Sequence, residues 1–95
     1  MKRPEPDRQN PVVATRERLG LSRNEVLSLS GVPYNVLWAV EKGAIPALPR
    51  KILAGFEKVG VNPESLANDY QTYRENKSRE IVDRVKDQTA GGTND

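Results

Sequence analysis

The chain contains no cysteine and no histidine among its 95 residues. The absence of cysteine excludes a disulfide framework and a thiolate metal site, and it is compatible with a reducing cytoplasm. The absence of histidine removes the most common general base and the most common metal ligand. The sequence also lacks a phosphate-binding glycine loop and a clustered pair of carboxylates. These absences favour a protein that is not an enzyme and holds no cofactor and no metal.

Long apolar runs are missing as well. No stretch is long enough to cross a bilayer, and residues 1–10 lack the apolar centre of a signal peptide. We therefore expect no membrane contact and a cytoplasmic location. Residues 11–60 carry seven basic and four acidic side chains, whereas residues 61–95 carry five basic and seven acidic ones. This division fits either a front half that binds a polyanion or an ordinary solvated surface.

The sequence does contain a series of helix signals, with no strand-like alternation, which predicts an all-α fold. Asn10–Pro11 and Asn62–Pro63 each combine an N-cap with a proline in the first turn, and Ser22-x-x-Glu25 is a capping box. Glycines end the first four segments. The predicted helices cover residues 11–19, 23–30, 34–42, 49–59 and 63–88. We expect residues 1–10 to form a flexible arm and residues 89–95 a disordered tail.

The segment "GVPYNVLWAVEKG" exposes an unusual face if it is helical. At about 100° per residue, Val36, Leu37 and Val40 share the side that faces the core. The opposite side is centred on the only tryptophan and comprises Tyr34, Asn35, Trp38, Ala39 and Lys42. A short linker before this helix forces a sharp turn from the helix at residues 23–30.

The stretch "LSRNEVLSLSGVPYNVLWAVEKG" resembles the helix-turn-helix of the Xre/Cro family, the lambda-repressor-like proteins. The matching positions are Leu21–Ser22, Glu25, Val26, Gly31–Val32, Leu37, Val40, Glu41 and Gly43. Residues 44–66 are similar to the fourth and fifth helices of that family, so the resemblance covers about residues 12–66. It implies a four- to five-helix bundle, here with an extended C-terminal helix. It also implies a bacterial or phage-encoded regulator, often a homodimer, that binds double-stranded operator DNA.

The resemblance also implies roles for individual residues. Residues 34–42 would be the recognition helix, which lies in the major groove. Pro33 replaces the usual serine or threonine before this helix, and Ala39 replaces a long polar side chain. Asn35 is then the one side chain able to read adenine with two hydrogen bonds. The base-reading face comprises Pro33, Tyr34, Asn35, Trp38 and Ala39, and the expected phosphate contacts are Arg23, Lys42, Arg50 and Lys51.

Trp38 has three interpretations at this stage: an apolar contact with DNA, an anchor for a protein partner, or packing against another part of the chain. Two functions follow from these interpretations. The first is a small repressor that occludes a promoter. The alternative is a protein-interaction module on the same scaffold, of the antirepressor or antitoxin kind, with Trp38 as its anchor.

The last predicted helix is longer than a five-helix bundle needs. Its apolar side chains form a sparse stripe that Lys77 interrupts. We expect the stripe near Leu66 and Tyr70 to pack on the preceding helices. Farther along, we expect it to contact a partner or a second copy of the chain. The candidate partner or dimer contacts within residues 67–88 are Tyr70, Tyr73, Ile81, Val82 and Val85.

Overall fold

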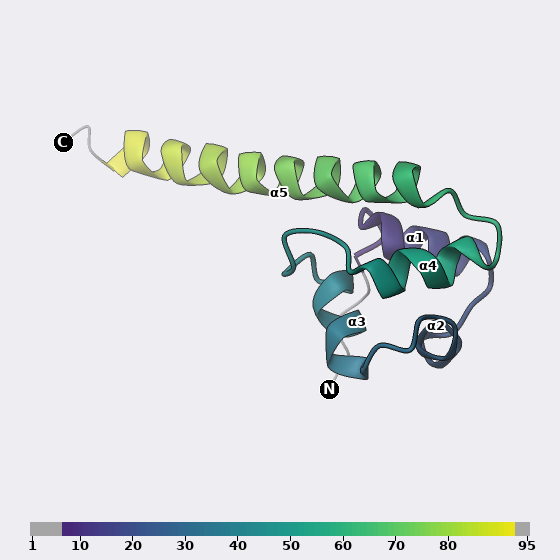
Figure 1. Ribbon diagram of the computed structural model, residues 1–95. Coiled ribbons are helices and arrows are strands. Elements are labelled where there is room, and N and C mark those ends of the chain that lie inside the picture. Colours follow the sequence, from purple (N-terminus) through teal and green to yellow (C-terminus); the bar gives the residue numbers. More distant parts are fainter. Residues whose placement is uncertain (1–6, 93–95) are drawn as a thin grey trace.

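The computed structural model describes residues 7–92, with side chains described through residue 88. This part of the chain contains five α-helices and no strand, which confirms the predicted all-α class. None of these helices combines the length and the apolar character that a bilayer span requires, over the residues described. The helices are α1 (Pro11–Arg18), α2 (Arg23–Ser30), α3 (Tyr34–Glu41), α4 (Arg50–Glu57) and α5 (Pro63–Gly92) (Figure 1).

Local capping explains where the helices begin and end. The Asn10 side chain accepts a hydrogen bond from the Val12 N–H, and both hydrogen bonds of the Ser22–Glu25 capping box are present. Gly31 follows α2 in the left-handed conformation, with φ of 72°, which glycine adopts without a steric penalty. The predicted boundaries of the first four helices are therefore correct to within one or two residues.

The core lies between α1 to α4 and the first half of α5. Helix α2 packs chiefly on α4, while α1 and α4 both pack on α5. The α2–α4 approach is close because a Cβ on Gly55 would lie only 3.0 Å from the Ser30 Cα. The buried cluster consists of Val12, Val26, Val32, Leu37, Val40, Leu48, Ile52, Phe56, Leu66, Tyr70 and Tyr73.

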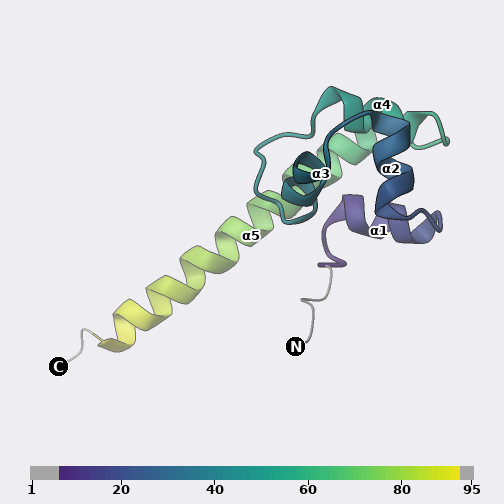
Figure 2. The same ribbon diagram turned by 90° about the horizontal axis from the view of Figure 1, so that it is seen from below.

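Helix α5 extends well beyond the other four helices. Figures 1 and 2 show its second half projecting away from them in two perpendicular views. At 1.5 Å per residue, its 30 residues span about 45 Å. The helix reaches Gly92, so the predicted end at residue 88 is four residues too early. Residues 93–95, the rest of the predicted tail, lie outside the described residues.

The end of the predicted flexible arm is attached to the domain. Asn10 is fully buried, and the Tyr73 hydroxyl donates a hydrogen bond of 2.6 Å to the Asp7 carboxylate. Lys77 Nζ lies 3.2 Å from the same carboxylate. Asp7 and Asn10 therefore attach this segment to the domain, whereas Arg8 and Gln9 between them are exposed. The partners of Asp7 come from α5, which local sequence does not reveal. Residues 1–6 lie outside the described residues.

Helix α5 also holds the connection between α3 and α4. The Tyr70 hydroxyl donates to the Ile45 carbonyl at 2.7 Å, and Arg74 Nε donates to the Gly43 carbonyl at 3.0 Å. Because these donors satisfy carbonyls that no helix ladder uses, they keep the eight-residue connection, residues 42–49, in one position. The C-terminal end of α3 is thereby fixed relative to α5.

Candidate nucleic-acid interface

The outward face of α3 carries the side chains expected to read bases. Tyr34 is 53% exposed and Trp38 is 48% exposed. Pro33 and Asn35 are also exposed, whereas Ala39 is half-buried. Exposure of Trp38 confirms the predicted helical phase, and it argues against the interpretation of Trp38 as a packed side chain, because nearly half of its surface is open to solvent. Four of the five predicted base-reading residues therefore lie open on one face, with Ala39 at its edge.

The inward face of α3 explains why this orientation is stable. Leu37 and Val40 are fully buried, and Val36 is half-buried. Rotating the helix to bury Trp38 would expose these aliphatic side chains, each of which contributes about 1.5–3 kcal/mol when fully buried. The exposed aromatic face is therefore the consequence of a correctly buried aliphatic one.

The N-terminus of α3 has no side-chain cap. Pro33 occupies the N-cap position with extended backbone and supplies no side-chain acceptor. The first N–H groups of a helix have no acceptor within it, so those of Tyr34 and Asn35 are directed to the outside. A helix N-terminus with free N–H groups attracts anions, through both hydrogen bonding and the helix dipole.

Lys42 follows α3 and is directed at the aromatic face. Its ammonium lies 4.2 Å from the centroid of the Trp38 ring. A cation at this distance over an indole is attracted by the ring quadrupole, by about 0.5–1 kcal/mol at an exposed site. Lys42, which is expected to contact a phosphate, therefore stacks on the exposed Trp38, so a basic group lies on an apolar surface.

Arg23 is held by an acid that sequence analysis did not select as a site residue. The Glu41 carboxylate accepts from Arg23 Nε at 2.8 Å and from Arg16 Nε at 2.7 Å. The hydrogen bond with Glu41 raises the pKa of Arg23. Glu41 and Arg16 are nearly buried, whereas the Arg23 side chain is 40% exposed. The Arg23 guanidinium is therefore anchored by its Nε edge and remains accessible to solvent.

Asn10 is the second residue whose role the sequence did not reveal. Besides capping α1, its side-chain amide donates to the Val40 carbonyl at 2.9 Å and to the Glu41 carbonyl at 3.0 Å. These carbonyls belong to the last turn of α3, where helix acceptors run out. A helical wheel gives no such signal for Glu41, because it lies about 20° from the exposed Tyr34 and about 40° from the buried Leu37, at the border of the two faces.

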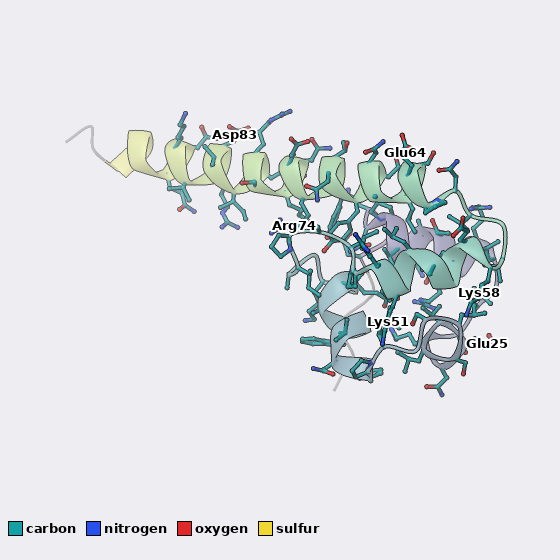
Figure 3. The ribbon with its side chains drawn as sticks, in the orientation of Figure 1. Glu25, Lys51, Lys58, Glu64, Arg74 and Asp83 are labelled. Atoms are coloured by element: carbon teal, nitrogen blue, oxygen red, sulfur yellow. The ribbon has the colours of Figure 1, made fainter. Side chains whose placement is uncertain are left out.

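Arg50 and Lys51 are exposed in the first turn of α4. Pro49 precedes them and provides no side-chain cap. Figure 3 shows Lys51 directed from α4 to the side on which α2 and α3 lie. Two cations at a helix N-terminus repel the positive end of the dipole, so an external anion would stabilise them. Their contact with phosphate stays a prediction.

Two of the predicted partner contacts are wrong. Tyr70 is fully buried and Tyr73 is 7% exposed, with their ring centroids 6.2 Å apart. Burial and the hydrogen bond to Asp7 raise the pKa of Tyr73, and burial raises that of Tyr70. Both rings fill the core because this half of α5 runs across α1 and α4, so neither is available to a partner.

The other predicted contacts lie on the projecting half of α5. Ile81, Val82 and Val85 are 50%, 46% and 47% exposed. Nothing in the described part of the chain covers them. Their role as a partner or dimer contact stays a prediction.

The described residues offer no group of three or more acidic side chains placed to hold a metal ion. Comparisons with protein-family models, with curated proteins and with solved structures found no match for this chain.

Proposed function

We propose that this protein is a sequence-specific DNA-binding regulator with a lambda-repressor-like helix-turn-helix made of α2 and α3. In this proposal α3 lies in the major groove and α2 lies across the sugar–phosphate backbone. The protein would repress transcription by covering a promoter. The homodimer implied by the family resemblance stays part of this proposal.

One observation carries the proposal. Helix α3 presents Tyr34, Asn35 and Trp38 to solvent while Glu41, on the same helix, is locked to α1 and α2. A reading helix must be held rigidly, since its contacts depend on sub-ångström placement. An exposed tryptophan offers a large contact surface, and a helix N-terminus without a side-chain cap offers N–H groups to an anion. Both features support a binding face.

The chemistry of this face suits base and phosphate contacts. The Asn35 side-chain amide can form two hydrogen bonds with adenine: its N–H donates to N7 and its oxygen accepts from the N6–H. Trp38 can pack on thymine methyl groups, and Tyr34 can donate to a phosphate. Arg23, already fixed through its Nε, can bind a phosphate with little further loss of side-chain entropy.

A selection from a random double-stranded DNA pool tests the proposal. An enriched motif is expected, and two half-sites about 34–36 Å apart would report a dimer. With four predicted phosphate contacts per chain, log K should fall with log salt at a slope of about −3.6 per bound chain. A folded protein that enriches no motif and shows no salt dependence would contradict the proposal.

Asn35→Ala provides a sharper test of base reading. It should relax the preference at one base pair, at a cost of about 1–3 kcal/mol in specific binding, and leave non-specific affinity unchanged. Arg23→Gln is the matched variant, because it should weaken binding to all sequences equally and reduce the salt slope by about 1. Equal losses in specific and non-specific binding for Asn35→Ala would show that its role is structural.

The alternative is a protein-interaction module that uses Trp38 as its anchor. The aromatic character of this face favours it, because Tyr34 and Trp38 are both about half exposed and large aromatic side chains are typical anchors of protein interfaces. The two functions differ in their response to salt. A tryptophan-anchored protein contact should change little between 50 and 200 mM salt, whereas DNA binding should weaken steeply.

A further inference from the structure

The projecting half of α5 carries none of the residues that the proposed DNA contact involves. Beyond Tyr73 the helix leaves the core, and every side chain from Ser78 to Gln88 is exposed. Ile81, Val82 and Val85 remain about half exposed on this segment. Branched aliphatic side chains disfavour an isolated, fully solvated helix, so their placement here needs another explanation.

The charges around these aliphatic side chains are sorted by sign. At about 100° per residue, Ser78, Ile81, Val82 and Val85 fall within a stripe about 100° wide, hereafter the apolar stripe. The basic side chains flank the stripe on both sides, about 90–110° from its midline, and the acidic ones lie at the back, about 150–170° away. The flanking bases are Lys77, Arg79, Arg84 and Lys86, and the acids at the back are Glu80, Asp83 and Asp87.

The three-dimensional arrangement agrees with this sorting. Ser78 and Ile81 line a hollow of about 370 Å³ between α5 and the end of α3, together with Lys42, Arg74 and the ion pair of Lys77 with Asp7. Figure 3 shows Arg74 on the side of α5 that faces the other helices and Asp83 on the opposite side.

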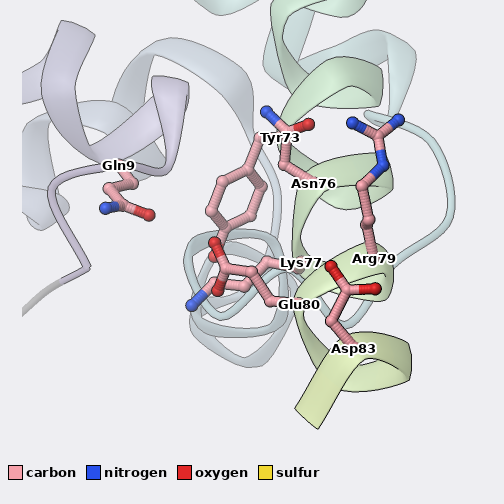
Figure 4. Close-up of a pocket in the computed structure, with 7 residues that line it drawn as sticks. All are labelled: Gln9, Tyr73, Asn76, Lys77, Arg79, Glu80 and Asp83. Carbon is pink, nitrogen blue, oxygen red and sulfur yellow. The ribbon is translucent and has the colours of Figure 1, made fainter. Parts of the chain in front are cut away.

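The acids face a different space. Glu80 and Asp83 line a separate hollow of about 550 Å³ with Gln9 and Asn76 (Figure 4). Lys77 and Arg79 also border it. The side of α5 that carries the apolar stripe therefore has basic side chains on its borders, and the acidic side chains of this half of α5 are turned away from it.

We propose that the apolar stripe of α5 binds an amphipathic helix of another protein, one whose own apolar face is bordered by acidic side chains. In paired helices the residues that flank the seam decide the partner, because they meet the flanking residues of the other helix. Here both flanks are basic. Acidic flanks on the partner would place opposite charges together along both edges.

A second copy of this chain is the less suitable occupant. In a parallel pair the two different flanks meet, and in an antiparallel pair each flank meets its own copy. Both arrangements would bring cation against cation along the seam. One flank carries Arg79 and Lys86, and the other carries Arg84 together with Lys77, whose charge is paired with Asp7. Like charges in direct opposition suppress a pairing.

The test measures the binding of two synthetic helical peptides to the full-length protein by fluorescence anisotropy. Each peptide has three heptads, about 21 residues, with the same leucine and isoleucine seam. One carries glutamate at the flanking positions and the other carries lysine. The buried area is small, so we expect a dissociation constant on the order of 10–100 µM for the glutamate peptide. The lysine peptide should bind at least about 10-fold more weakly.

Variants assign the binding to the stripe and its flanks. The double substitution Ile81→Asp and Val85→Asp should raise the dissociation constant of the glutamate peptide at least about 10-fold. Val59→Asp is the matched control, since Val59 is also exposed, at 38%, but lies away from α5's projecting half. Arg79→Glu with Lys86→Glu should reduce the preference for the glutamate peptide, an effect that loss of folding cannot imitate.

Three results would overturn the proposal. The first is equal affinity for the two peptides, or no binding of either up to about 1 mM. The second is self-association of the protein, measured by sedimentation equilibrium, that Ile81→Asp abolishes, because the occupant would then be a second copy. The third is binding to anionic phospholipid vesicles that depends on the same residues while neither peptide binds.

Discussion

Replacing Glu41 with glutamine should destabilise the protein severely, although the two side chains have the same shape. Glu41 is 6% exposed and accepts charged hydrogen bonds of 2.7 and 2.8 Å from Arg16 and Arg23. Glutamine keeps one acceptor oxygen but turns a donor group to the other arginine. It also leaves two positive charges with no negative charge between them.

The magnitude follows from the burial of the two arginines. Removing one partner of a buried ion pair typically costs 3–5 kcal/mol, because the remaining charge stays buried without compensation. Arg16 is 9% exposed and keeps only the Leu21 carbonyl, at 3.1 Å, as another acceptor. Arg23 is 40% exposed, so water can solvate it and its share of the loss is small. We therefore expect a loss of about 3 kcal/mol, near the lower end of that range.

Urea denaturation followed by circular dichroism at 222 nm measures this loss, and Glu17→Gln is the matched control. Glu17 pairs with Arg8 at 3.1 Å on the surface, where the arginine is 67% exposed, so its removal should cost less than about 1 kcal/mol. In thermal melts, Glu41→Gln should lower Tm by roughly 12–24 °C. A loss for Glu41→Gln no larger than for Glu17→Gln would refute the reasoning.

Three further predictions concern other parts of the molecule. The hydrogen bond from Tyr73 lowers the pKa of Asp7 below 3.8. The ionised Asp7 carboxylate should therefore stabilise the fold above about pH 4. That effect should disappear as the pH falls through the lowered value, so the stability difference between wild type and Asp7→Asn should shrink from pH 5 to pH 2. A constant difference would contradict this. Gly43→Ala should destabilise more than Gly31→Ala in urea, since both have φ of +72° but only at Gly43 would a Cβ meet Tyr73, at 2.8 Å. Equal losses would remove the steric argument. Trp38→Ala should weaken DNA binding while lowering Tm by no more than about 4–8 °C, and a larger drop would mean that this side chain is structural.

Much of the fold could be predicted because helix boundaries are set by short-range chemistry. The capping box at Ser22 and Glu25 and the glycine at residue 31 act through neighbouring backbone groups, so their effects are visible in the sequence. The phase of α3 was equally accessible. Leu37 and Val40 identify its buried side, and Trp38 therefore had to be exposed.

Tyr70 and Tyr73 show where sequence reasoning failed. In the sequence they precede Ile81, Val82 and Val85 in one sparse series of apolar side chains, and all five were predicted to contact a partner. The structure separates them, because α5 crosses the domain for the first part of its length and then leaves it. The point at which a helix leaves its core depends on the size of the other helices, which helical periodicity does not contain.

The sequence by itself determined the helices, their ends and the amphipathic faces, because these depend on groups within four residues of one another. Only the tertiary structure decided that Glu41 bridges Arg16 and Arg23, that Asn10 binds the last turn of α3, and that Asp7 is anchored to α5. These partners are 18 to 66 residues apart in the chain. Long-range polar contacts require two elements to be packed before their side chains can meet, so local pattern carries no record of them.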